Sequence, residues 1–174
     1  MEYFRLRQDE RQPYGIIFKG FHDIPNAMEA VKGNANLLDD MTVVFVTSSK
    51  YNWYPAVLSR QLFMYKESVK QTVDIYCPNL EYRHFCILDK KNRIYEYYYI
   101  PILEAFNCMS ESSEYNLDKS IIKKIVLKRE VLPEASVFRL GEVKDQVVIV
   151  TLAVAESLIR RNIDGIQLQR VWLD

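Results

Sequence analysis

The alternation of apolar and polar residues predicts β-strands along much of the chain. Residues 41–46 are apolar and mostly β-branched, and Asp39-Asp40 and Ser48-Ser49 bound them, which is typical of a strand. Residues 3–7 mix apolar and charged side chains, as a half-buried strand does. Shorter strand-like runs complete the set: 15–18, 121–127, 136–140, 147–150 and 166–171.

A β-hairpin is expected over residues 81–100. Two strand-like runs, 81–88 and 94–100, are separated by Asp89-Lys90-Lys91-Asn92, a composition typical of a turn. Three tyrosines of the second run alternate along it and therefore share one face. Packing against the partner strand is the simpler interpretation of this face, and a tyrosine-rich protein-binding surface is the alternative. The three are Tyr95, Tyr97 and Tyr99.

Two segments carry the period of an amphipathic helix. Residues 66–76 form the first, and Pro78 stops the helix soon after it. Residues 152–161 form the second, with Thr151 in position to cap it. At most one further helix is expected, a short one near residues 27–31. The apolar faces contain Val69, Val73 and Tyr76 in the first helix, and Leu152, Ala155, Leu158 and Ile159 in the second.

One layout occurs twice: an apolar run, a helix, a short turn and a strand, over residues 62–88 and 147–171. The two copies share no sequence similarity, so this is common architecture rather than duplication. Many strands with two main helices indicate the α+β class. We expect one domain over residues 1–174, with a mixed or antiparallel sheet of about eight to ten strands.

Composition excludes several classes of protein. The chain has 174 residues, 49% of them apolar, which is too apolar for a disordered chain. Lys plus Arg and Asp plus Glu both number 23, so neither a dedicated nucleic-acid binder nor an acidic nucleic-acid mimic is indicated. A charged N-terminus and the lack of a long apolar run argue against a signal peptide and a membrane span. Three cysteines without a paired spacing favour a reducing cytoplasm.

The chain lacks the common signatures of catalysis. Its five glycines form neither a dinucleotide fingerprint nor a phosphate loop, and it has no GxSxG or HExxH motif. Only two histidines, His22 and His84, are present, whereas a zinc site normally takes three or four protein ligands. We therefore expect no enzyme activity, no cofactor and no metal.

His84 and Cys86 form the sharpest exception. Two residues apart on a strand, they point to the same face, so they could be half a metal site or a Cys–His pair. No third ligand has motif spacing, and a buried thiol beside an amphipathic histidine is the simpler interpretation.

Two charged clusters are better explained as solvated surface than as functional sites. Glu111, Glu114 and Asp118 lie in a Ser-rich loop, where carboxylates are usually solvated rather than catalytic. A basic stripe with interleaved apolar residues fits a solvated strand face better than an RNA or DNA track. The stripe consists of Lys119, Lys123, Lys124, Lys128 and Arg129.

An aromatic loop is the best candidate for a contact surface. Tyr51, Trp53 and Tyr54 lie in a loop closed by Pro55. Large aromatic side chains in a loop need either a core to pack on or a binding partner. We expect these three residues to contact a partner.

The C-terminal stretch combines a short helix, a glycine turn and a final strand. Its residues 154–161 are Val-Ala-Glu-Ser-Leu-Ile-Arg-Arg, followed by Asn162-Ile163-Asp164-Gly165-Ile166 and the strand. This ending resembles the helix, glycine turn and strand that close one family of immunity proteins from bacterial polymorphic toxin systems. The strand Val137-Phe138-Arg139 ahead of the helix and the size of the chain agree in general terms. The family has no fixed catalytic set, so no functional residue is carried over.

This resemblance implies a cytoplasmic protein that binds and occludes a cognate toxin, with the chemistry in the toxin. An inhibitor of this kind uses aromatic anchors at the centre of a complementary surface. Two alternatives stay open: a regulatory or scaffold module for an unrelated protein partner, and a small enzyme using Cys86 and His84. Sequence leaves the oligomeric state undefined.

Overall fold

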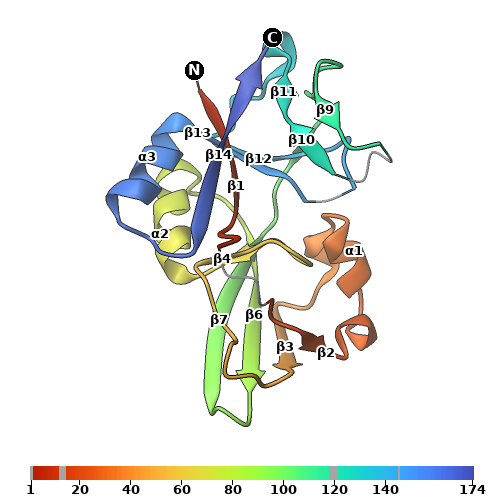
Figure 1. The fold of residues 1–174 in the computed structure, drawn as a ribbon, viewed down its shortest axis with the longest axis vertical. Coiled ribbons are helices and arrows are strands. Elements are labelled where there is room, and N and C mark those ends of the chain that lie inside the picture. The colour runs from red at the N-terminus through yellow and green to blue at the C-terminus, as the bar shows by residue number, and fades with distance from the viewer. Residues whose placement is uncertain (1, 12–14, 118–120, 145) are drawn as a thin grey trace.

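The computed structural model describes residues 2–11, 15–117, 121–144 and 146–174 (Figure 1). Asp118 and Lys119, which belong to the charged clusters considered above, lie outside these ranges. Within them, no helix is both long enough and apolar enough to cross a membrane.

The first sheet has six strands in the order β11-β14-β1-β13-β12-β8. β1 lies at its centre and pairs antiparallel with β13 on one side and β14 on the other. Short parallel pairings add β11 and β8 at the edges. The bounds are β1 (Tyr3–Gln8), β8 (Ala105–Phe106), β11 (Val126–Leu127), β12 (Val137–Leu140), β13 (Val148–Thr151) and β14 (Ile166–Leu173).

The second sheet has the order β2-β3-β6-β7-β5-β4. β6 and β7 form the predicted antiparallel hairpin, and β3 pairs parallel to β6. In Figure 1 the tip of this hairpin forms one end of the long axis, opposite both chain termini. The bounds are β2 (Phe18–Lys19), β3 (Met41–Val46), β4 (Val57–Leu58), β5 (Met64–Tyr65), β6 (Tyr82–Asp89) and β7 (Ile94–Pro101).

The helices lie where the sequence pattern predicts them, but the cap and the buried face of α3 differ from the prediction. α1 (Ala27–Val31), α2 (Glu67–Tyr76) and α3 (Leu152–Arg160) match the expected segments, and single 3-10 turns lie at Phe21–Asp23, Ala35–Leu37 and Arg129–Val131. Thr151 is the N-cap residue of α3, yet its side chain makes no capping hydrogen bond. The expected apolar face of α3 is wrong at Ile159, which is exposed, whereas Val154 is buried. The helix is turned so that its 154–155–158 face meets the core.

The two copies of the repeated layout adopt related arrangements. β5 and β6 run parallel with β7 between them, because both pair antiparallel with β7. β13 and β14 likewise run parallel on either side of β1. The connecting helices α2 and α3 lie side by side (Figure 1), and the hydroxyls of Tyr76 and Ser157 are hydrogen-bonded at 2.6 Å.

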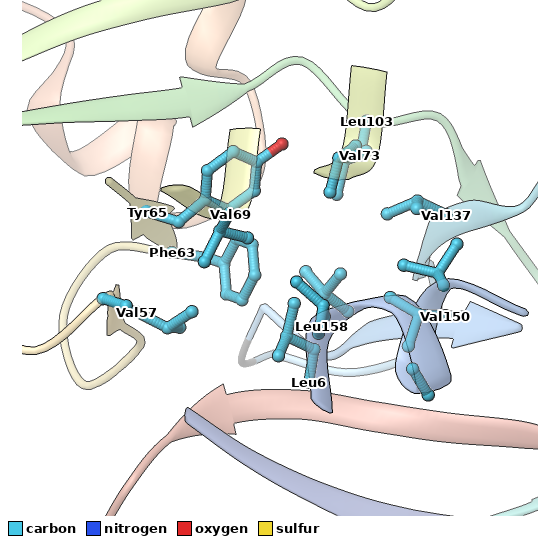
Figure 2. Close-up of a cluster of buried hydrophobic side chains, with 14 residues drawn as sticks. Leu6, Val57, Phe63, Tyr65, Val69, Val73, Leu103, Val137, Val150 and Leu158 are labelled. Carbon is cyan, nitrogen blue, oxygen red and sulfur yellow. The ribbon is translucent and has the colours of Figure 1, made fainter. Parts of the chain in front are cut away.

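A core between these helices and the two sheets joins the halves. Figure 2 shows Val69 and Val73 of α2 and Leu158 of α3 converging on Leu6 and Tyr65. All five side chains are almost fully buried. Since this cluster takes residues from both sheets, the chain is a single α+β domain.

The described residues contain 14 strands in three sheets, so the expectation of eight to ten strands is wrong. Most of the excess consists of two-residue strands, which are too short to show an alternating pattern. The run 121–127 illustrates the difference. It divides at Ile125 into β10 (Ile122–Lys124), which pairs with β9 (Glu114–Tyr115), and β11, which joins the first sheet.

Candidate functional site: the outer face of the second sheet

The two sheets differ in how their faces are covered. In the first sheet, Val148 and Val150 of β13 face the core beside α2 and α3, and Ile149 faces a separate buried cluster. In the second sheet, one face is buried with α1, through residues such as Val44 and Phe85. The opposite face of β3, β6 and β7 belongs largely to none of these clusters.

We call the face of β3, β6 and β7 that points away from α1 the outer face. Strand pairing places its nine side chains in three rows across β3, β6 and β7. Both histidine and cysteine of the sequence pair lie on it, as their spacing predicts. The rows are Met41–His84–Tyr99, Val43–Cys86–Tyr97 and Phe45–Leu88–Tyr95.

The outer face is apolar and yet exposed. The burial of β3 alternates strictly, and its three outward residues are Met, Val and Phe. Val43 is 49% exposed, Tyr97 53% and Tyr95 67%. A solvated sheet face normally carries polar side chains, whereas a contiguous apolar patch usually marks a binding surface.

Ring contacts order the tyrosine side of the face. Tyr95 and Tyr97 pack edge to face with ring centroids 6.1 Å apart, and His84 packs against Tyr99 at 5.2 Å. The exposure of Tyr95 and Tyr97 fits the alternative interpretation, a protein-binding surface, whereas Tyr99 is half-buried and packs across the strands against Tyr82 and His84. Aromatic side chains held in this way lose little conformational entropy when a partner covers them.

The environment of Cys86 does not favour a nucleophile. The residue is 6% exposed, and burial raises the pKa of its thiol, with a smaller opposing effect from Tyr97. The thiolate is the reactive form, so a raised pKa lowers reactivity. No cluster of three or more possible metal ligands occurs among the residues that the structure describes.

A notch lies where the outer face meets the hairpin turn. It has a volume of about 520 Å³ and is open to solvent. Its apolar wall consists of Phe45 and Leu88, and the ammonium of Lys90 lies 4.3 Å from the centroid of the Phe45 ring. Lys19 and Lys91 complete a cationic border.

Asp89, the last residue of β6 before the turn, faces away from the outer face and is almost fully buried. Its carboxylate accepts hydrogen bonds from Ser48, from the backbone of Asn92 at 3.2 Å, and from the side chain of Asn92 at 2.8 Å. The Tyr54 hydroxyl donates a further one at 3.3 Å. Burial acts to raise the pKa of Asp89, but these hydrogen bonds outweigh it and lower the pKa to about 2.

This carboxylate holds the aromatic loop against the hairpin. Tyr54 is half-buried, and Asn52 donates to Asp89 at 3.4 Å and to the Thr47 carbonyl at 2.9 Å. Trp53 is also half-buried, whereas Tyr51 is 52% exposed. Of the three predicted contact residues, Tyr51 therefore presents the most surface to a partner.

The other charged clusters are distributed over the surface. Glu114 pairs with Lys124 at 3.4 Å across β9 and β10. Lys124 also lies 5.9 Å from the ring centroid of Trp172. These contacts agree with a solvated strand face.

Sequence reasoning missed the outer-face residues of β3. Met41, Val43 and Phe45 belong to a strand that is apolar at almost every position, which is equally typical of a strand buried on both faces. The available signal was the neighbouring row of alternating tyrosines. No protein-family model matches the chain, and no curated protein sequence matches it significantly.

Proposed function

We propose that this chain is a non-catalytic, cytoplasmic immunity protein that neutralises a cognate bacterial toxin by binding it. The outer face is the proposed contact surface, and Tyr51 extends it at the hairpin end. The observation that carries the proposal is a largely apolar surface that is exposed on β3, β6 and β7, whose opposite face is mostly buried in the core with α1.

Exposure of this apolar surface to water costs free energy that a bound partner would recover. Burying one large apolar side chain contributes about 1.5–3 kcal/mol. Val43, Tyr95 and Tyr97 each retain about half or more of their surface to bury. Binding hot spots are enriched in tyrosine and cluster at the centre of an interface, which is the position of the Val43–Cys86–Tyr97 row.

The location of the face suits an occluding protein. The hairpin tip is the far end of the long axis (Figure 1), so a partner can approach it without meeting the first sheet. Inhibition by occlusion needs no reactive group in this chain. A buried thiol with a raised pKa is consistent with that role.

Co-expression with the toxin encoded next to the gene tests the proposal. We expect the chain to protect cells and the two proteins to elute as one complex on gel filtration. Unchanged killing without a complex would contradict it. A regulatory or scaffold module would use the same face, and a neighbouring gene unrelated to toxins would favour that alternative.

A further inference from the structure

We infer that the partner presents carboxylate side chains to the notch beside the outer face, next to an apolar contact. This inference rests on the proposed function and specifies the chemistry of the protein bound there. It comes from the arrangement of charges at the hairpin end, which the zero net charge of the whole chain conceals.

The first observation is a set of three exposed lysines around one apolar hollow. Lys19, Lys90 and Lys91 border the notch, and Phe45 and Leu88 form its wall. Among the described residues, none of the three ammonium groups has a carboxylate within ion-pair distance. Three cations around a hollow favour an entering anion.

The second observation is that the acid next to the turn, at the end of β6, is directed away from the lysines. Asp89 immediately precedes Lys90, yet its carboxylate is buried and saturated by Ser48, Asn92 and Tyr54. The Asp89 carboxylate therefore binds the aromatic loop and does not neutralise the lysines. The turn therefore presents cations outward while its own negative charge lies inside.

The third observation places an apolar group beside the charge. The Lys90 ammonium lies over the Phe45 ring, and Lys19 pairs with Phe45 across β2 and β3. A cation over an aromatic face is attracted to the ring and held there. A partner that inserts Asp or Glu into the notch can thus contact lysine and phenylalanine together.

A protein fits this pattern better than a nucleic acid. A phosphate backbone needs cations along its whole track. Here the three lysines occupy one end of the face, whereas exposed Asp39 and Asp40 precede β3 at its other end. Between the two ends lie aliphatic side chains such as Met41 and Val43, which suit a protein surface.

Two short peptides with identical Leu and Phe positions provide the test, one with Glu and one with Lys at every other position. They are titrated into the ¹⁵N-labelled chain, alongside oligo-dT. We expect only the Glu peptide to shift the amide signals of Phe45, Leu88 and Lys91. Its binding should weaken about tenfold between low and physiological salt.

Charge reversal provides the matched control. Lys90→Glu with Lys91→Glu should weaken binding of the Glu peptide at least about tenfold. Arg160→Glu with Arg161→Glu, at the end of α3, should leave it unchanged, and circular dichroism checks folding. Absence of notch shifts, equal binding of both peptides, or preferential binding of oligo-dT would overturn the inference. Shifts that appear on concentrating the chain alone would do so too, since they indicate a second copy.

The two proposals fail separately. Suppose that Val43→Asp abolishes toxin binding while Lys90→Glu with Lys91→Glu affects binding of neither the toxin nor the Glu peptide. The proposal that the outer face binds the toxin is then kept, and the inference that the partner is acidic is wrong. If the Glu peptide occupies the notch but the toxin is never bound, the notch stands and the proposed function is wrong.

Discussion

Val43 and Cys86 lie opposite each other in the middle row of the outer face, yet Val43 is half exposed and Cys86 is almost buried. Tyr97 continues this row on β7. The middle residue of the row, Cys86, is therefore buried, and its neighbours on either side, Val43 and Tyr97, are about half exposed. Every residue of this row belongs to a paired strand, so strand pairing fixes its backbone position in the sheet.

Adjacent residues of β3 should respond oppositely to a hydroxyl group. Val43→Thr places the hydroxyl in solvent, so the free energy of unfolding should change by no more than about 0.5 kcal/mol. Val44→Thr places it in the core with α1 and should cost about 1–3 kcal/mol. Urea denaturation measures both, and equal costs would show that the outer face is not exposed.

Asp89 should make stability dependent on pH in the acid range. Its folded pKa of about 2 lies below the value of about 3.9 for an unfolded Asp. The carboxylate therefore stabilises the fold above about pH 4, and this contribution is lost as the pH falls towards 2. Asp89→Asn should lower the free energy of unfolding at pH 7 by about 1–3 kcal/mol. The difference from wild type should shrink towards pH 2, and a constant difference would contradict this assignment.

The aromatic loop should separate into an anchor and a contact residue. Tyr54→Phe removes a hydrogen bond to Asp89, so it should cost about 1 kcal/mol of stability and leave toxin binding intact. Tyr51→Ala should change stability little and weaken toxin binding. Thermal denaturation and a binding titration on the same two variants distinguish these effects, and the reverse pattern would show that Tyr54 is the contact.

The three thiols should differ in alkylation rate. Cys77 is partly exposed, Cys86 is nearly buried, and Cys108 is fully buried with a pKa raised by burial to about 11. Iodoacetamide should modify Cys77 first and Cys108 last in the folded protein. Mass spectrometry at successive times gives the order. Rapid modification of Cys86 would instead support the alternative of an enzyme that uses this thiol with His84.

Long periodic segments were predictable from the sequence, because their side chains report one packed face. This applies to α2, to β3 and to the β6–β7 hairpin, where the turn composition also fixed the connection. Ile159 of α3 shows the limit. It has the right period for the core, but the rotation of α3 against α2 decides which neighbouring positions are buried.

The candidate site was predictable only in part. The alternation of Tyr95, Tyr97 and Tyr99 places them on one face, but whether that face is covered depends on where other segments pack. The same holds for β3, since α1 covers only the Val44 side. The sequence indicates only that Asp89 is an ordinary turn residue. Its role in holding the aromatic loop depends on the contact with Tyr54, which is 35 residues away in the chain.

The proposed contact between the outer face and a toxin is tested by the affinity of outer-face variants for a toxin that co-expression has identified as the partner. Val43→Asp and Tyr97→Ala are compared with Ile159→Asp, which alters an apolar residue on α3 that is even more exposed. Calorimetric titration should show a loss of at least about thirtyfold for the first two, because central tyrosine contacts are worth about 2 kcal/mol or more. Ile159→Asp should stay within about twofold of wild type. Binding by Val43→Asp as tight as that of Ile159→Asp would contradict the account.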